Sequence, residues 1–107
     1  MVQPQSRLGD KSLVPADTHG KDCCPHECIG PAVTGSPDVM VNSRPALRVT
    51  DTGIHALCCG PNTWVAVEGS TTVLINSLQA HRLEDLDQHC GGPGFMLEGS
   101  PDVLVGG

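Results

Sequence analysis

The segment "LEGSPDVLVG" at residues 97–106 decides the fold, because two earlier segments of the chain are copies of it. The copies are "VTGSPDVMVN" at 33–42 and "VEGSTTVLIN" at 67–76, so a glycine-serine pair recurs every 30 to 34 residues. Each copy ends in a short apolar run that is rich in valine and is bounded by turn-forming residues, a pattern typical of a strand. The chain therefore contains three degenerate copies of one strand-forming unit.

A second motif recurs between these copies, in the form of an arginine followed three residues later by an aspartate. It occurs as "SRLGD" at 6–10, "LRVTD" at 47–51 and "HRLED" at 81–85. After each aspartate we expect a loop that carries a histidine: "ADTHG" (16–20), "TGIH" (52–55) and "LDQHCGG" (86–92). The recurring aspartates favour capping or turn roles, since they do not form a pair of carboxylates in unlike environments.

The distribution of glycine and proline favours an all-β fold. The 13 glycines and 9 prolines are spread along the whole chain and interrupt every long helical pattern. Strands are predicted over these ranges: 38–42, 63–69, 71–76 and 102–106. We expect a single domain over residues 1–107, with residues 1–6 as a short N-terminal tail. Three copies indicate pseudo-threefold symmetry, in which three short sheets share one central core.

The composition predicts a thin core. Hydrophobic residues make up 38% of the chain, but it holds one Trp, one Phe and no Tyr, the residues that supply much of the buried area in most cores. Small domains with thin cores often need a disulfide or a metal ion. Six cysteines and five histidines are the candidates for that role.

Charge and hydropathy exclude several partners and locations. The net charge of −6 argues against nucleic acid or an anionic membrane surface as the main partner. No apolar stretch is long enough to span a membrane, and the N-terminus has no apolar segment of the kind that a secretory signal requires. We therefore expect synthesis in the cytoplasm, where metal binding or buried thiols are favoured over disulfides.

The histidines that recur in the repeat predict a metal site. His19, His55 and His89 lie in equivalent segments, so pseudo-threefold symmetry brings their imidazoles to one end of the axis. Cys90 is the predicted fourth ligand, because it adjoins His89 and precedes two glycines that let a tight loop form. Imidazole and thiolate ligands favour zinc, and four of them make the closed geometry of a structural site.

Other residues compete for these positions. His89 and Cys90 are neighbours, and neighbouring side chains in an extended chain point in opposite directions. His26, Cys59 or His81 therefore remains an alternative to one of them, although we interpret His81 itself as a packing or surface residue. The remaining cysteines are either thiols or partners in a disulfide: Cys23, Cys24, Cys28 and Cys58.

The sequence does not favour an enzyme. No nucleophile elbow, phosphate-binding loop, zinc-protease motif or dinucleotide fingerprint is present. His89 and Cys90 make a poor catalytic dyad. A nucleophile and its base must be in contact, and the side chains of adjacent residues seldom are. We expect no catalytic residues and no organic cofactor.

The repeated pieces resemble the PAAR-repeat family, whose members are the sharp tips of contractile injection machines. These machines are type VI secretion systems, related phage tails and extracellular injection particles. The resemblance covers the chain from about Arg7 to Gly107 and lies in these pieces: "SRLGD…THG", "GSPDVMVNSRPALRVTD" and "HRLEDLDQHCGGPGFMLEGSPDVLVGG". The proline-alanine-alanine-arginine signature occurs only as "RPALR" (44–48) and "LQAHR" (78–82).

The resemblance implies the PAAR-repeat fold, a small cone of three pseudo-threefold-related β-sheets with one zinc ion near its apex. Histidines and one cysteine hold the zinc in that family, and His19, His55 and Cys90 match its loop positions. The resemblance also implies a triangular base that caps the trimeric β-helical spike protein, called VgrG, with one tip chain per trimer.

A spike tip of this kind is expected at the end of the injection particle, from which it leaves the cell or enters a target cell. It contacts the target membrane mechanically, and effector cargo bound elsewhere is a further expected partner. The alternative function is a free-standing small binding or adaptor module, held together by zinc or a disulfide.

Overall fold

A computed structural model of the chain describes residues 2–17, 26–54, 63–89 and 92–106. Within these ranges the regular structure consists of twelve β-strands. The all-β prediction is therefore confirmed. None of the described residues forms a helix of the length and apolarity that crossing a membrane requires.

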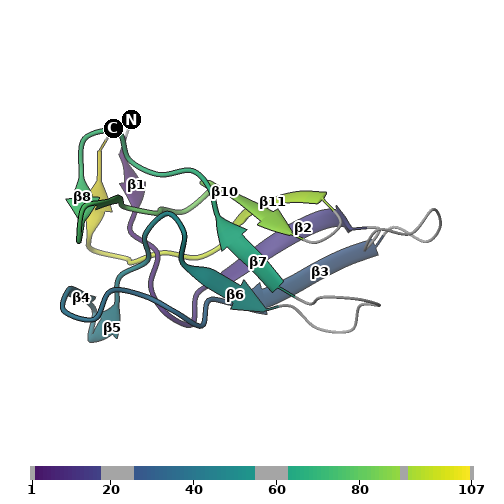
Figure 1. Cartoon of the computed structure of the whole chain (residues 1–107), viewed down its shortest axis with the longest axis horizontal. Coiled ribbons are helices and arrows are strands. Elements are labelled where there is room, and N and C mark those ends of the chain that lie inside the picture. Colours follow the sequence, from purple (N-terminus) through teal and green to yellow (C-terminus); the bar gives the residue numbers. More distant parts are fainter. Residues whose placement is uncertain (1, 18–25, 55–62, 90–91, 107) are drawn as a thin grey trace.

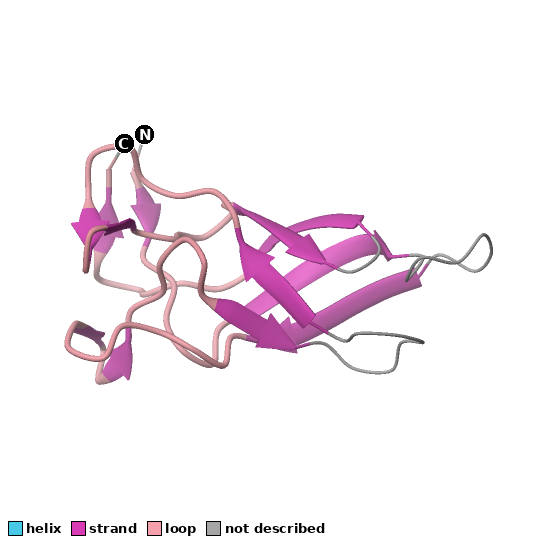
Figure 2. Cartoon of the chain, in the orientation of Figure 1, coloured by secondary structure: helices cyan, strands magenta, loops and turns pink. Residues whose placement is uncertain are grey.

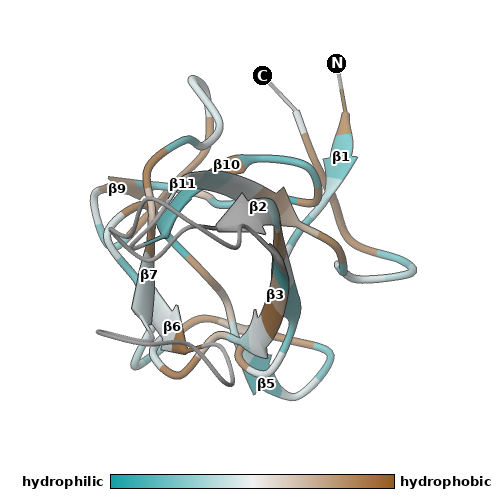
Figure 3. Ribbon diagram, turned by 90° about the vertical axis from the view of Figure 1, so that its right-hand side faces the viewer, coloured by the Kyte–Doolittle hydropathy of each residue, from teal (hydrophilic) through white to brown (hydrophobic). Residues whose placement is uncertain are grey.

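Three antiparallel hairpins join side by side in one six-stranded sheet, with the strand order β3-β2-β11-β10-β7-β6. Its strands are β2 (Lys11–Asp17), β3 (His26–Pro31), β6 (Thr52–Ile54), β7 (Thr63–Ala66), β10 (Leu86–His89) and β11 (Gly92–Met96). A bridge between Ala32 and Gly53 joins the two outer strands, so the sheet is nearly closed. Figure 3 looks onto the end at which the hairpins point and shows these strands around a common centre.

Three two-stranded sheets lie at the opposite end of the molecule (Figures 1 and 2). They pair β4 with β5, β8 with β9, and β1 with β12. The strands are β1 (Gln3–Pro4), β4 (Met40–Val41), β5 (Arg44–Pro45), β8 (Leu74–Ile75), β9 (Leu78–Gln79) and β12 (Leu104–Val105). We call this end of the molecule the base.

The turns of the base repeat the same backbone conformation. Asn42 and Ser43 have φ angles of 54° and 66°, and Asn76 and Ser77 have 53° and 67°. Two consecutive residues with positive φ make the tight turn whose twist matches an antiparallel hairpin, and asparagine adopts that conformation more readily than most residues. In the third copy, the first and last strands of the chain, β1 and β12, form the equivalent pair.

The core is built in two apolar clusters of mostly small side chains, as the composition predicts. The cluster at the base comprises Val41, Ala46, Ile75, Ala80 and Val105. The second cluster comprises Ala32, Leu47, Trp64 and Met96, and the last two belong to strands β7 and β11 of the six-stranded sheet. Trp64 is the largest side chain among the fully buried ones, so it fills space that small residues leave.

Two details of the sequence analysis need correction. The N-terminal segment is not a tail from residue 2 onward, because Gln3–Pro4 pairs with β12 and the side chains of Gln5 and Ser6 are fully buried. The repeat explains this, since the segment supplies the strand that completes the third base sheet. The segments expected to be histidine loops begin instead as strands of the six-stranded sheet, among them Leu86–His89.

Candidate functional site

His89 lies at the end of β10, with its imidazole in the interior of the sheet. The burial along Leu86–His89 alternates, so Asp87 and His89 point inward while Leu86 and Gln88 face outward. The exposed fraction of His89 is 2%. The ring of Trp64 lies beside the imidazole, with 6.0 Å between the two ring centroids.

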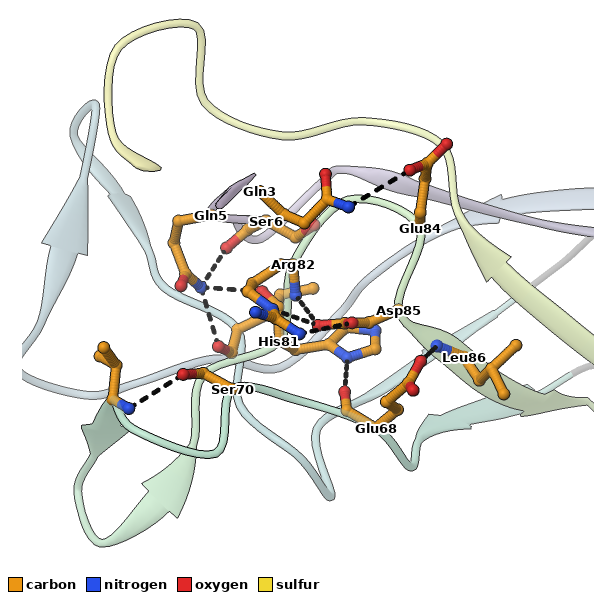
Figure 4. A network of polar contacts seen from close by, with 12 residues as sticks. Gln3, Gln5, Ser6, Glu68, Ser70, His81, Arg82, Glu84, Asp85 and Leu86 are labelled. Carbon is orange, nitrogen blue, oxygen red and sulfur yellow. Dashed lines mark hydrogen bonds and ion pairs between the residues drawn. The ribbon is translucent and has the colours of Figure 1, made fainter. Parts of the chain in front are cut away.

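A chain of hydrogen bonds leads from His89 through the interior, and we call it the buried relay. Nε2 of His89 lies 2.9 Å from Oγ of Ser12, and that hydroxyl lies 2.5 Å from Oδ2 of Asp87. Oδ1 of Asp87 lies 2.7 Å from Nε2 of His81. Nδ1 of His81 in turn lies 2.6 Å from the backbone oxygen of Glu68 (Figure 4). The side chains of all four relay residues are fully buried: Ser12, His81, Asp87 and His89.

Two glycines make room for the rings next to the relay. A methyl group on Gly94 would lie 2.7 Å from the His89 ring and even closer to the backbone oxygen of Leu13. A methyl group on Gly53 would overlap the Trp64 ring. Both positions therefore exclude a side chain as long as the two rings keep these places.

The structure describes one residue of the predicted metal set. His89 is that residue, whereas His19, His55 and Cys90 lie outside the described residues. Cys23, Cys24, Cys58 and Cys59 lie outside them as well. Among residues 2–17, 26–54, 63–89 and 92–106, no three histidine, cysteine or acidic side chains are close enough together to hold a metal ion.

The hairpins nevertheless bring the attachment points of the predicted ligands to one end of the molecule (Figure 1). The last strand pairs before the connecting segments are Asp17 with His26, Ile54 with Thr63, and His89 with Gly92. The described residues that flank the segments carrying His19, His55 and Cys90 therefore all lie at that same end. His89 is suited to bind zinc, because Ser12 contacts Nε2 and so orients the imidazole ring. Most metal-bound histidines are oriented in this way through the nitrogen that does not bind the metal.

His81 is not available as an alternative ligand. Each of its ring nitrogens lies within 2.7 Å of an oxygen acceptor, one on Glu68 and one on Asp87. The interpretation of His81 as a packing residue is correct in that the side chain is fully buried, but its polar role was not predicted. The signal that could have revealed it is the spacing of Asp87 and His89, which share one face of a strand.

The base carries exposed apolar side chains at threefold-equivalent positions. Met40, Leu74 and Leu104 each stand at the first position of one strand of a base sheet, in β4, β8 and β12. Their exposed fractions are 56%, 62% and 61%. Side chains this exposed contribute little to the core, so their recurrence in all three copies points to a use outside it.

Polar contacts hold the three base sheets to one another. The Asn42 amide donates to Oδ1 of Asp102 over 2.8 Å, and the Asn76 amide donates to Oδ1 of Asp38 over 2.7 Å. Ser70 completes the ring with a hydrogen bond of 2.6 Å to the backbone oxygen of Gly106. The bonds from Asn76 and Ser36 lower the pKa of Asp38, and those from Asn42 and Ser100 lower the pKa of Asp102.

Comparison with known proteins agrees with this arrangement. The family model described as PAAR motif matches residues 24–93, about two thirds of the chain. No curated protein matches the chain.

Proposed function

Because the chain belongs to the PAAR-motif family, we propose that it caps the trimeric β-helical spike of a contractile injection or secretion machine. Spike-tip proteins of this family are structural rather than catalytic, and they are associated with VgrG-type spike proteins of secretion machinery. The observation that carries the proposal is the apolar ring on the base: Met40, Leu74 and Leu104.

The apolar ring matches the threefold symmetry of a trimeric spike. A trimeric spike ends in three identical strand ends, and a single chain can meet all three only if it presents the same surface three times. The three base sheets would supply that surface, since β4, β8 and β12 are equivalent in register: Met40 pairs with Pro45, Leu74 with Gln79, and Leu104 with Pro4. One tip chain would therefore occupy one trimer.

Burial of the ring would provide the binding energy. An exposed Leu or Met side chain gains about 1.5 to 3 kcal/mol when it is fully buried. The Asn–Asp contacts of the base hold the three sheets in fixed positions before binding, so less ordering is needed on contact.

At the opposite end we propose one structural zinc ion, bound by His19, His55, His89 and Cys90. What supports it is the common end at which the three hairpins close and the buried imidazole of His89. Zinc would cross-link the segments that carry these four residues, and such sites contribute about 10 kcal/mol or more to folding. A tip pushed through a target membrane needs this resistance to unfolding.

We also propose that the protein is made in the cytoplasm and leaves it at the tip of the particle. This route follows from the proposed capping of the spike. Effector cargo would attach to another component or to the sides of the cone. The machine that carries the tip is a type VI secretion system, a phage tail or an extracellular particle.

Binding to the VgrG-type spike protein of the same genome tests the capping proposal. Leu104→Asp places a charge in the apolar ring, and we expect it to weaken binding at least tenfold. Leu86→Asp is the matched control, because Leu86 is also an exposed leucine but lies on the six-stranded sheet. If both variants lose the same binding affinity, or if neither loses any, the base is not the docking surface.

A further inference from the structure

The donors and acceptors of the buried relay can be assigned in order, because the relay ends on a backbone oxygen, which can only accept a hydrogen bond. The backbone oxygen of Glu68 accepts a hydrogen bond from Nδ1 of His81, so Nδ1 carries a proton. Nε2 of His81 and Oδ1 of Asp87 then share a second proton across 2.7 Å. Whichever of them carries it, Oδ2 of Asp87 remains an acceptor, and the nearest donor to it is the hydroxyl of Ser12 at 2.5 Å.

The single hydroxyl proton of Ser12 decides the state of His89. Ser12 has two acceptors other than the histidine, Oδ2 of Asp87 at 2.5 Å and the backbone oxygen of Phe95 at 3.3 Å. The shorter bond goes to the carboxylate, and with either acceptor the hydroxyl of Ser12 donates to an oxygen and not to the imidazole. The contact of 2.9 Å between Ser12 and His89 must then use a proton on Nε2 of the imidazole.

We propose that Ser12, held by Asp87 and His81, is a positioning residue that keeps the proton of His89 on Nε2 and leaves Nδ1 as the zinc-binding nitrogen. This inference rests on the proposed zinc site for its purpose, but the position of the proton is independent of any metal. A neutral imidazole has one protonated nitrogen, so fixing the proton on Nε2 makes Nδ1 the nitrogen with a lone pair.

Packing around the ring supports the same role. Trp64 lies beside the imidazole, and the absence of a side chain at Gly94 lets the ring approach the neighbouring strand. The ring is thus held by contact as well as by its bond to Ser12. Partners that fix the tautomer and orientation of a metal-bound histidine change metal affinity by about 10- to 100-fold when they are removed.

The relay also departs from the threefold repeat. The register of the hairpins places Ser12, Gly53 and Asp87 at equivalent positions, two residues after the recurring aspartate. A serine and an aspartate on two of the three strands can meet inside the sheet, whereas the glycine on the third makes room for Trp64. The repeat therefore places these three residues at equivalent positions, and the relay forms because the residue types at those positions differ.

The first test is the position of the proton in the unaltered full chain. Long-range proton–nitrogen correlation spectra of the ¹⁵N-labelled protein, as purified and after treatment with EDTA, report the protonated nitrogen of each histidine. The His89 signals are those absent from His89→Gln. We expect a proton on Nε2 in both samples. A proton on Nδ1, or fast exchange between both nitrogens, would overturn the proposal.

The second test removes the hydroxyl. Ser12→Ala should let the His89 proton exchange between both nitrogens and should weaken zinc binding about 10- to 100-fold in competition with a chromogenic chelator. Ser12→Thr should restore both properties. Ser6→Ala is the matched control, because Ser6 is equally buried but donates to Glu98 outside the relay.

The two tests separate failure of the relay from failure of the zinc site. If the protein binds no zinc, the zinc proposal fails, and the spectra still show whether Ser12 sets the tautomer. If zinc binds and Ser12→Ala keeps the proton on Nε2, the relay does not position His89. Should Ser12→Ala not fold, the spectrum of the unaltered chain alone decides.

Discussion

The guanidinium of Arg48 lies against the carboxylate of Asp51, with 2.9 Å between Nε and Oδ2 and 3.0 Å between Nη2 and Oδ1. The same aspartate accepts a third bond from the backbone nitrogen of Arg48, at 2.8 Å. The other two copies, Arg7 with Asp10 and Arg82 with Asp85, repeat these three distances to within 0.1 Å. Each pair closes the turn between a base sheet and a hairpin of the six-stranded sheet.

Replacing one of these aspartates should therefore destabilise the fold. Asp51→Asn removes the charge that the guanidinium needs in a largely buried position, and we expect the free energy of unfolding to fall by about 3 kcal/mol. Denaturant titration measures the change. Glu84→Gln is the control, because within the described part of the chain its carboxylate makes a single long contact, 3.4 Å from the Gln3 amide. A loss for Asp51→Asn no larger than that of the control would show that the pair does not hold the turn.

The repeat allowed the threefold arrangement to be predicted, because each Arg-x-x-Asp motif acts locally and forms the same turn wherever it occurs. The six-stranded sheet was harder to foresee, since β2 contains Pro15 and lacks a clean alternation of polar and apolar residues. Its strands become visible only when the three hairpins lie side by side. For this reason the sequence predicted loops at residues that the structure shows to be in strands.

The relay was not predictable from any one copy of the repeat. His81 and Asp87 are residue types that are usually exposed, and their burial depends on Ser12, which is distant in the sequence. The histidine pattern did identify His89 as an inward-facing residue of interest. Its three predicted companions remain predictions: His19, His55 and Cys90.

Backbone strain after the Arg-x-x-Asp arginine offers a second test. The residue two positions after each arginine has a positive φ: 90° at Gly9, 86° at Thr50 and 71° at Glu84. A branched residue in that conformation lowers the stability of the fold by about 1 to 2 kcal/mol. Replacement by glycine, which has no Cβ, restores part of this stability. Thr50→Gly should raise the free energy of unfolding by about 0.5 to 1 kcal/mol in denaturant titration, and Gly9→Ala should lower it. A less stable Thr50→Gly protein would contradict this account.

Close packing at Gly53 predicts a large effect of one methyl group. Gly53→Ala forces the added carbon into the Trp64 ring, and overpacking of this kind costs about 1 to 3 kcal/mol. Thermal unfolding should show a clear drop in Tm. Gly106→Ala is the matched control, because no atom lies within 4 Å of the added carbon there. Equal Tm values for the two variants would mean that the ring can move.

Acid should weaken the base. The pKa values of Asp38 and Asp102 are lowered in the folded chain by amide and hydroxyl donors. A lowered pKa contributes stability above the ordinary value of 3.8, and this contribution is lost as the pH falls through the folded value. We expect the stability to decline from about pH 4 downward, and Asp38→Asn with Asp102→Asn to flatten that decline. An unchanged pH profile in the double variant would show that these contacts do not contribute.

Zinc content tests the predicted ligand set. Atomic absorption should find about one zinc per purified chain, and His55→Ala or Cys90→Ala should lower zinc content and Tm together, because binding and folding are coupled. Gln88→Ala changes an exposed neighbour of His89 and should alter neither. A residue whose replacement leaves both quantities unchanged is not a ligand, and a fully folded, metal-free protein would contradict the zinc proposal.

The mass of the complex between this chain and the proposed partner, a VgrG-type spike protein, tests the capping claim most directly. Native mass spectrometry separates a spike trimer with one bound chain from one with three. The threefold base predicts a single chain on each trimer, at any excess of the tip protein. Three bound chains, or a trimer that remains bare, would contradict the account.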